Sequence, residues 1–348
     1  MELLDLISKR AALASNIGSL KTDGVIYRPE REAQVLRRLV EQNQGPLSNE
    51  SIESIYKSIM SNCRALEKQI TVAFLGPLGT FSEEASMKQF GESIVSMQTS
   101  SIDEVFHLVE SHKAHYGVVP VENSTEGAIN RTLDLLLTSN TMICAEIILP
   151  VHHNLLVLNG QKIEDIKEVY SHAQGLSQCS KFIKENNITE HIRADTAGSA
   201  EMISKTKDVK QAAIASSLSA EIYGLDIIQK NIENERGNLT RFLVMGKNIS
   251  QPEFESKKYI TSFLFKLKSK PAALYQSLGG FAINGVNLTK LQSYPEKNTF
   301  DSFFFLCDLD GHIEDPKVQK SLEELGLHCE DFHVLGVFEA DKLREKKN

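Results

Sequence analysis

Residues 71–85 read TVAFLGPLGTFSEEA, a stretch that joins a short apolar strand to a helix through a glycine-rich turn. The apolar start has the β-branched and aromatic content of a buried strand. Gly76 and Gly79 would let a ligand approach the backbone of the turn. Thr80 and Glu83 have the spacing of a capping box, which predicts a helix start whose N–H groups face an anion. The turn lacks the sequence of a P-loop or a dinucleotide-binding loop, which argues against a nucleotide site.

The same strand-and-helix pattern continues through residues 70–248. Apolar strands alternate with helices that begin near Ser, Thr or Asn, which predicts a mostly parallel sheet with crossover helices. Because the segment is long for one sheet, we predict a two-lobed α/β domain. Besides Thr71–Leu75, the predicted strands are Tyr116–Val121, Ile143–Leu149, His153–Leu158, Val169–Ser171, Ala212–Ala215 and Thr240–Met245.

Residues 1–69 have the apolar spacing of helices throughout. One helix is predicted up to Leu20, a second over Glu30–Gln42 with Pro29 in its first turn, and a third over about Ser48–Lys68. Three helices bury only a thin core. We therefore expect this all-helical domain to pair with another copy, giving a homodimer or a higher homo-oligomer.

The last part of the chain has the order β-α-β-β-α-β and follows a polar linker at residues 249–257. That order predicts a separate domain with a ferredoxin-like fold over residues 258–340. The predicted elements are Tyr259–Lys268, Ala272–Phe281, Val286–Ser293, Thr299–Asp308, Pro316–Leu325 and Cys329–Phe338.

The composition argues against several classes of protein. The 348 residues carry a net charge of −8, which is unlike a general nucleic-acid or anionic-membrane binder. The sequence has no apolar run of about 18 residues and no signal peptide pattern, so no membrane partner is expected. Five scattered cysteines predict reduced thiols and a cytoplasmic location. The ten histidines have no cysteine or carboxylate at ligand spacing, so no metal site is predicted.

Polar residues gather at the ends of the predicted strands. Because open α/β sheets bind ligands at the carboxyl ends of their strands, these residues predict a site for a polar, anionic small molecule. Arg241 could clamp a carboxylate, Thr240 could hydrogen-bond a leaving hydroxyl, and Glu122 could act as a general acid. Further candidate donors are Thr80, Ser82, Asn123, Ser171 and Gln178.

Each of these side chains also has an ordinary structural explanation. The amides and hydroxyls could cap helices, Arg241 could form a surface ion pair, and Glu122 could favour a helix N-terminus. Two other classes of protein fit two α/β lobes: a solute-binding protein with a regulatory tail, and an amino-acid sensor. Turnover of a substrate would exclude both.

Four motifs, in this order, make the chain resemble the prephenate dehydratase family. They are GPLGTFSEEA (76–85), VVPVENS (118–124), SHAQGLSQC (171–179) and NLTRF (238–242). The resemblance implies a site in the cleft between two lobes, with no metal or cofactor. It implies that Thr240 is the key catalytic hydroxyl, and that the substrate or the chemistry also involves Glu122, Asn123, Ser171 and Gln178. The family removes the ring hydroxyl and a carboxylate of prephenate together, giving phenylpyruvate, CO2 and water.

The helical N-terminus resembles the chorismate mutase that precedes the dehydratase in bifunctional P-proteins. The matching stretches are LISKR (6–10), YRPEREAQVL (27–36) and IMSNCRALE (59–67). The resemblance implies substrate binding near Glu32, with Glu67 at the ether oxygen of chorismate. A carboxylate cannot donate a hydrogen bond, so Glu67 would have to be protonated, and mutase activity is expected to fall as the pH rises. The cations that suit this dianionic substrate are Arg10, Lys21, Arg28 and Arg31.

Mutases of this type carry a further arginine on the first helix, before the position of Arg10, that this sequence does not contain. The leading interpretation is a bifunctional enzyme that acts on chorismate and prephenate. The alternative is a monofunctional prephenate dehydratase whose impaired, N-terminally short mutase domain serves dimerisation.

The C-terminal segment resembles an ACT regulatory domain, which by analogy binds phenylalanine as an effector. The match lies at KPAAL (270–274) and LQSYP (291–295). It implies effector contacts at Ala273, Leu274 and Ser293. Three positions depart from the family pattern, with Ala272 in place of Gly, Gln292 in place of Glu and Tyr294 in place of Arg.

Overall fold

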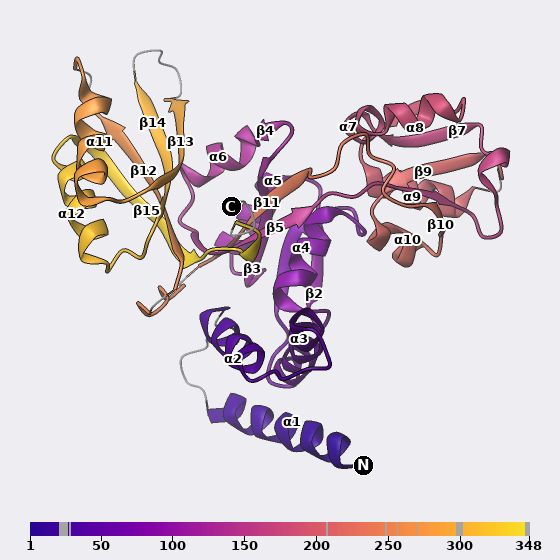
Figure 1. Ribbon diagram of the computed structural model, residues 1–348, viewed down its shortest axis with the longest axis horizontal. Helices are drawn as coiled ribbons and strands as arrows, with labels where there is room; N and C mark the ends of the chain where they lie inside the picture. The colour runs from indigo at the N-terminus through magenta and orange to yellow at the C-terminus, as the bar shows by residue number, and fades with distance from the viewer. Residues whose placement is uncertain are drawn as a thin grey trace.

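The computed structural model describes residues 1–20, 27, 29–206, 208–247, 249–255, 257–268, 270–296 and 302–344. Figure 1 shows a row of three parts: the C-terminal sheet domain, a first α/β lobe in the centre and a second α/β lobe. The N-terminal helices lie below the central lobe in that view. No helix among the described residues is long and apolar enough to cross a membrane.

The N-terminal segment forms three helices, as predicted. They are α1 (Glu2–Leu20), α2 (Pro29–Glu41) and α3 (Asn49–Ala65). The Ser48 hydroxyl caps α3 by accepting a hydrogen bond from the Ser51 N–H. Among the described helices, α1 packs mainly against α3, and its apolar side chains Leu6 and Leu13 are 63% and 62% exposed. Figure 1 shows it at the outer edge of the helical segment. A large part of the apolar face of α1 is therefore uncovered within one chain.

The first lobe is a sheet of order β2-β1-β3-β11-β5, with short β4 beside β3. Strand β1 is parallel to β2 and β3, whereas β11 is antiparallel to both of its neighbours. Helices α4, α5 and α6 belong to this lobe. The bounds are β1 (Thr71–Leu75), α4 (Phe81–Phe90), β2 (Val95–Thr99), α5 (Ile102–Glu110), β3 (Tyr116–Asn123), β4 (Gly127–Ala128), α6 (Asn130–Leu136), β5 (Met142–Pro150) and β11 (Leu239–Gly246).

The second lobe is a sheet of order β10-β6-β9-β7-β8. Strand β7 is parallel to β8 and β9, and β6 is antiparallel to β9 and β10. The bounds are β6 (Asn154–Val157), η1 (Ile163–Asp165), β7 (Glu168–His172), α7 (Ala173–Gln178), α8 (Ser180–Glu185), β8 (Thr189–Arg193), α9 (Thr196–Lys205), β9 (Gln211–Ala215), α10 (Ser217–Tyr223) and β10 (Asp226–Gln229).

The prediction of mostly parallel sheets was wrong, because both sheets are mixed. The chain leaves the first lobe after β5, builds the second lobe, and returns as β11 between β3 and β5. This returning strand pairs with both of them in the antiparallel direction. The two lobes are consequently joined by two crossing segments, at residues 151–153 and 230–238.

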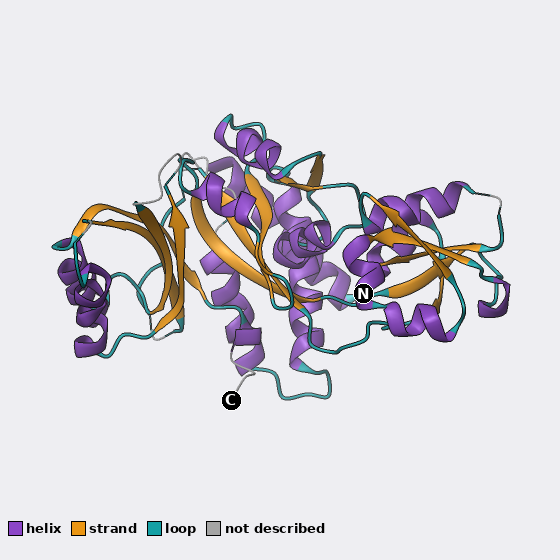
Figure 2. Ribbon diagram, turned by 90° about the horizontal axis from the view of Figure 1, so that it is seen from above, coloured by secondary structure: helices purple, strands orange, loops and turns teal. Residues whose placement is uncertain are grey.

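The C-terminal segment has the ferredoxin-like strand order β13-β14-β12-β15. Figure 2 shows its helices together on the outer face of this sheet. Leu264, Leu306 and Leu335 on the inner face join one apolar core with the first lobe. At Gly336, a Cβ atom would lie 2.0 Å from the backbone oxygen of Ile143 in β5. The bounds are β12 (Tyr259–Leu267), α11 (Ala273–Asn284), β13 (Leu288–Pro295), β14 (Phe303–Asp310), α12 (Pro316–Gly326), β15 (Cys329–Glu339) and η2 (Lys342–Arg344).

Candidate active site

A cleft of about 390 Å³ lies between the two α/β lobes. Both lobes line it. Thr80, Ser82 and Asn123 come from the first lobe. Gln178 comes from the second lobe, and His153 comes from the connecting segment at residues 151–153. Thr240, at the start of the returning strand β11, lines it as well. The lining is made of hydroxyls, amides, imidazoles, two acids and apolar groups, with no lysine or arginine among the described lining residues.

Thr240 and Asn123 form the centre of the cleft on the first lobe. They are opposite each other in the β3–β11 pair, and the Asn123 Nδ2 amide donates a 2.9 Å hydrogen bond to the Thr240 hydroxyl oxygen. The backbone register skips Val121 between Glu122 and Pro120, which is the geometry of a β-bulge. This bulge allows both Pro120 and Asn123 to face the cleft.

Gln178 and His153 form the opposite wall of the cleft. Gln178 Oε1 lies 2.9 Å from His153 Nε2 and accepts a hydrogen bond from Asn238 Nδ2 at 3.1 Å. Gln178 Nε2 and His153 Nδ1 are both buried, and neither has a hydrogen-bond partner among the described residues. Burial lowers the pKa of His153, so the imidazole is neutral near pH 7. The wall thus contains one buried donor and one buried acceptor that have no partner among the described residues.

Thr80 and Ser82 lie at the start of α4. The Thr80 hydroxyl accepts from the Glu83 N–H and donates to the Leu75 carbonyl, so it caps the helix as predicted. The Glu83 carboxylate accepts from the Gly79 N–H at 2.6 Å rather than from Thr80. Gly79 does not approach a ligand: its carbonyl accepts hydrogen bonds from the second lobe, and an added Cβ would lie 2.8 Å from Ser219 Oγ.

Ser171 lies at the end of β7 but is outside the cleft lining. Its side chain is fully buried and donates a 2.7 Å hydrogen bond to the Ile214 carbonyl of β9. An added Cβ on Gly175, which does line the cleft, would lie 2.8 Å from Ser171 Oγ. The structure therefore places Ser171 behind the first turn of α7 rather than in contact with the cavity.

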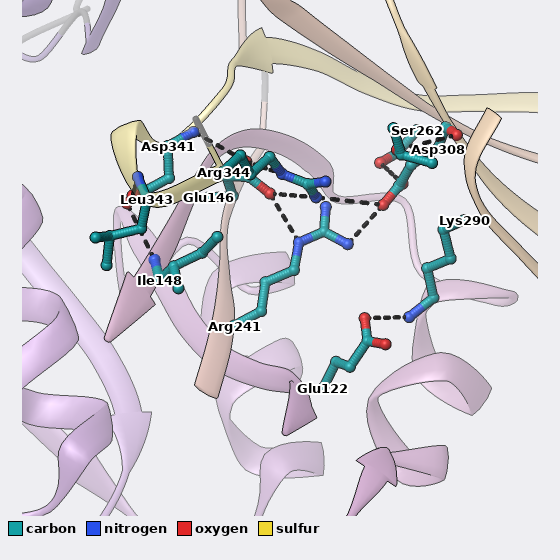
Figure 3. Close-up of polar contacts among 11 residues, drawn as sticks. Glu122, Glu146, Ile148, Arg241, Ser262, Lys290, Asp308, Asp341, Leu343 and Arg344 are labelled. Carbon is teal, nitrogen blue, oxygen red and sulfur yellow. Dashed lines mark hydrogen bonds and ion pairs between the residues drawn. The ribbon is translucent and has the colours of Figure 1, made fainter. Parts of the chain in front are cut away.

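The structure corrects the predicted roles of Glu122 and Arg241. Side chains alternate along a strand, so these neighbours of Asn123 and Thr240 point to the opposite face of the sheet. Neither residue lines the cleft. Figure 3 shows Glu122 paired with Lys290 of the C-terminal sheet, with 2.7 Å between Glu122 Oε2 and Lys290 Nζ.

Arg241 is buried between two carboxylates instead. Its Nε donates to Glu146 Oε2 at 2.7 Å and its Nη1 donates to Asp308 Oδ2 at 2.5 Å. Figure 3 shows these contacts together with Arg344 from the C-terminal end of the described chain. Burial acts to raise the pKa of Asp308, but Arg241 and the Ser262 hydroxyl hold this pKa below its ordinary value. Both carboxylates are satisfied within the protein, so Arg241 is not the predicted substrate clamp.

His153 is one of the cleft residues that sequence reasoning missed. The histidine pair at 152 and 153 was set aside because it lacks partners at metal-ligand spacing. Its position could have indicated a role in the cleft. His153 directly precedes β6 of the second lobe, and so it lies in a segment that joins the two lobes.

The described part of the helical segment does not gather its predicted mutase residues into one pocket. Arg31 is exposed and bonds Gln34 on its own helix, and Glu67 lies beyond the end of α3. Glu32 forms an ion pair with Arg64, and burial raises the pKa of Glu32 although Arg64 acts in the opposite direction. The positive charge of Arg10 on α1 also acts on Glu32. Lys21 and Arg28 are outside the described residues.

Arg64 has a second role that was not predicted. Its Nη2 donates to the Phe90 carbonyl of α4 at 2.5 Å, and its guanidinium lies over the Tyr27 ring, 4.7 Å from the centroid. This buried side chain therefore connects α3 of the helical segment to α4 of the first lobe.

The predicted effector residues lie on α11 and β13. Ala273 is buried at the start of α11, Leu274 is half-buried, and Ser293 is exposed. Ala272 precedes the helix in a left-handed conformation with φ of +61°. The Tyr294 hydroxyl, at a position that departs from the family pattern, hydrogen-bonds Asp134 of the first lobe.

Two family models match this chain. The prephenate dehydratase family matches residues 72–250, and the chorismate mutase type II family matches residues 1–68. The bifunctional chorismate mutase/prephenate dehydratase of Stutzerimonas stutzeri is 40% identical, over 97% of this chain and 93% of that protein. The enzyme of the same description from Neisseria gonorrhoeae is also 40% identical, with the same coverage.

A solved structure has the same fold over most of the chain. It is the prephenate dehydratase of Arthrobacter aurescens in complex with L-Phe, which is 29% identical with a TM-score of 0.72. The match covers 78% of this chain and 90% of that one.

Proposed function

This chain belongs to the family of bifunctional chorismate mutase/prephenate dehydratases, and we propose that its interlobe cleft is the dehydratase site. The family has both activities in one chain, and this chain spans nearly the full length of its bifunctional relatives. The observation that carries the assignment is the Asn123–Thr240 hydrogen bond in a cleft lined by both lobes. No metal or cofactor is needed for the steps described below.

Thr240 assists the departure of the ring hydroxyl of prephenate. The bond from Asn123 occupies a lone pair of the Thr240 oxygen, so the hydroxyl proton is free to point at the leaving oxygen. As the C–O bond breaks, the C–C bond to the ring carboxylate also breaks and its electron pair completes the aromatic ring. The products are phenylpyruvate, CO2 and a hydroxide ion, which takes up a proton to become water. Thr240 stabilises the negative charge on the departing oxygen by hydrogen bonding.

Neutral groups bind and orient the rest of the substrate. The free Nε2 of Gln178 is a donor for a carboxylate oxygen, and the free Nδ1 of His153 is an acceptor for a hydroxyl proton. The start of α4 adds backbone N–H groups next to Ser82.

Turnover of prephenate tests this assignment. Thr240→Val keeps the shape of the side chain and removes the hydroxyl, so kcat should fall by about 100-fold or more, the usual loss for one oxyanion donor. Thr240→Ser keeps the hydroxyl and should retain much more activity. Equal activity of the two variants would contradict the assignment.

We propose that the mutase site is completed by a second copy of the chain, in a homodimer or higher homo-oligomer. Leu6, Leu13 and Ile17 lie on one face of α1 and are 55% to 63% exposed, which suits burial against a partner. Arg10 is on the same helix and its charge already acts on Glu32, so pairing through α1 would hold this cation at the mutase site. Sedimentation of the full chain, with Leu13→Lys as the disrupting variant, tests the pairing. A monomer with full mutase activity would contradict it.

In the alternative, only the dehydratase of this chain is active. Supplying chorismate and prephenate in parallel distinguishes this alternative from a chain with both activities. Phenylpyruvate from chorismate, above the uncatalysed rearrangement, shows that both sites act. If phenylpyruvate forms from prephenate but not from chorismate, the helical segment serves dimerisation and has no mutase activity.

We propose that the C-terminal domain is an ACT domain that binds phenylalanine through Ala273, Leu274 and Ser293. Support comes from its topology and from the similar dehydratase whose structure was determined with L-Phe. Calorimetry with phenylalanine tests the proposal. The absence of both binding heat and inhibition at millimolar phenylalanine would reject it.

We also propose a cytoplasmic location, which the five free cysteines support.

A further inference from the structure

A larger cavity lies beside the helices of the N-terminal segment. Its volume is about 1010 Å³, at the upper end of the range of about 300–1,000 Å³ that is typical of small-molecule sites. Helices α2 and α3 form one side of it, with Glu32 and Lys57 in the lining. Phe254, Lys257 and the end of β15 form the other side. None of its described lining residues also lines the interlobe cleft, so the two sites are separate.

One side of α3 carries two cations that face Glu32. Lys57 and Arg64 are seven positions apart, which is about two helical turns and therefore the same side of the helix. Arg64 forms an ion pair with Glu32 of α2, and the positive charge of Lys57 also acts on Glu32. Arg10 of α1 adds a third positive charge. Cations from two helices therefore surround Glu32, which the family resemblance places near the mutase substrate.

Lys57 differs from three other cations of the cavity wall, because it lacks a carboxylate partner. Arg37, Lys257 and Lys342 each form an ion pair with a glutamate. The half-buried Lys57 side chain donates only a long hydrogen bond, of 3.3 Å, to the Lys88 carbonyl, and it forms no ion pair with any described residue. Its ammonium is thus the one of these four that is available to an anion in the cavity.

The surroundings of Lys57 favour such an anion. Burial lowers the pKa of Lys57, Glu53 opposes this effect, and the positive charges of Lys88 and Lys342 add to it. A partly desolvated ammonium with two like charges nearby destabilises the protein. A carboxylate bound in the cavity would relieve that cost.

We propose that Lys57 is a substrate-binding residue of the mutase site, and that its ammonium binds a carboxylate of chorismate. The proposal deepens the proposed mutase function and rests on it. In the rearrangement the ether C–O bond breaks and a new C–C bond forms, while both carboxylates of the substrate stay ionised and no proton moves. Lys57 therefore binds the ground state and the transition state about equally, so it acts on KM rather than on kcat.

Lys57→Met in the full chain tests the proposal, because it removes the charge and keeps most of the side-chain length. The KM for chorismate should rise by about 10- to 100-fold at nearly constant kcat, which is the loss expected for one hydrogen bond to a charged group. Prephenate turnover by the same chain should not change, since Lys57 does not line the interlobe cleft, and it shows that the variant is folded. Lys113→Met, which removes a charge from an exposed loop, is the matched control and should keep the parent KM.

The thermal midpoint distinguishes a binding residue from a structural one. An ammonium that is kept for substrate binding does not support the fold, so Lys57→Met should keep or raise the midpoint. Lys57→Arg retains the charge and should restore most of the affinity for chorismate. A lower midpoint of Lys57→Met with the parent KM would assign Lys57 to the fold and overturn the proposal.

Failure of this proposal and failure of the proposed function have different signatures. If the parent rearranges chorismate and Lys57→Met has the same KM, Lys57 does not bind the substrate, and the proposed mutase function stands. If the parent does not rearrange chorismate while it turns over prephenate, the mutase function and the role of Lys57 are refuted together.

Discussion

The Asn123 side chain can only donate to Thr240, because its own orientation is fixed by the backbone. Asn123 Oδ1 accepts hydrogen bonds from the N–H groups of Thr125 and Glu126 at 2.9 and 3.1 Å. The Nδ2 amide is thereby turned towards Thr240 Oγ1 at 2.9 Å and Asn238 Oδ1 at 2.8 Å. The Thr240 oxygen must therefore act as the acceptor in this pair, which leaves its proton for the substrate.

The first prediction is that Asn123→Asp reverses this polarity. A carboxylate at the same place accepts the Thr240 proton instead of donating to the oxygen, so the hydroxyl turns away from the leaving group. We expect kcat for prephenate to fall by about 100-fold, as for loss of an oxyanion donor. Asn140→Asp, on an exposed loop, is the control for an added negative charge. An Asn123→Asp enzyme with the parent kcat would rule out the proposed direction of this hydrogen bond.

The second prediction concerns the acid side of the pH profile. Burial lowers the pKa of His153 below its ordinary value of 6.5, despite the nearby carboxylate of Glu233. Protonation at Nδ1 would convert the free acceptor in the cleft into a donor. Values of kcat/KM for prephenate should thus hold down to pH 6.5 and decline below it, with an apparent pKa lower than that of a free histidine.

His153→Gln keeps a donor for Gln178 and removes the titration, so this acid limb should disappear. His152→Gln is the matched control, because His152 is the exposed neighbour of His153. Its Nδ1 lies 2.8 Å from Glu233 Oε1, whereas Glu233 Oε2 accepts a hydrogen bond from the His153 backbone N–H. If the limb persists in His153→Gln, another group is responsible for it.

The third prediction follows from the corrected place of Glu122. Its carboxylate is on the interface side of the sheet, 42% exposed and paired with Lys290. The side chain of Lys290 is 10% exposed, so Glu122→Gln leaves a largely buried ammonium without its carboxylate and should cost about 1–3 kcal/mol of stability. Its kcat for prephenate should equal that of the parent across the pH range. A loss of kcat at a temperature where the variant is fully folded would return Glu122 to the role of proton donor.

Glu122 and Arg241, two of the predicted site residues that lie outside the cleft, show where sequence reasoning stopped. Strand ends and their hydroxyls and amides were recognisable, so Thr240, Asn123 and Gln178 were placed together. Period-two alternation already implies that Glu122 and Arg241 face away from them. What the sequence did not show was their partners, Asp308 and Lys290, which lie 67 and 168 positions away in the chain.

The elements that were missed have a similar cause. Strands β2 and β8, with the sequences VSMQT and TEHIR, are short and largely exposed or half-buried. They lack the apolar run that marked the buried strands. Their pairing is set by the neighbours β1 and β7, so their strand character depends on tertiary contacts rather than on local pattern.

The fourth prediction is that Ala272→Gly stabilises the C-terminal domain. The residue has φ of +61°, and a left-handed conformation costs a residue with a Cβ atom about 1–2 kcal/mol. Glycine relieves this strain but adds roughly 0.4–1 kcal/mol of unfolded-state entropy. We expect a net gain of up to about 1 kcal/mol, seen as a higher urea midpoint at constant slope. Ala282→Gly, inside helix α11, is the control and should lower the midpoint. A lower midpoint for Ala272→Gly would show that its backbone is not strained.

The fifth prediction tests a close backbone contact between the C-terminal sheet and the first lobe, at Gly336 and Ile143. A methyl group at Gly336 would lie 2.0 Å from the Ile143 oxygen, and a backbone atom cannot move aside as a flexible side chain can. Gly336→Ala must therefore push β15 away from β5, and we expect a loss of about 1–3 kcal/mol, as for overpacked cores. Gly326→Ala, where an added Cβ meets no atom within 4 Å, is the matched control. A Gly336→Ala protein with the stability of the parent would show that β15 can move away from β5 without cost.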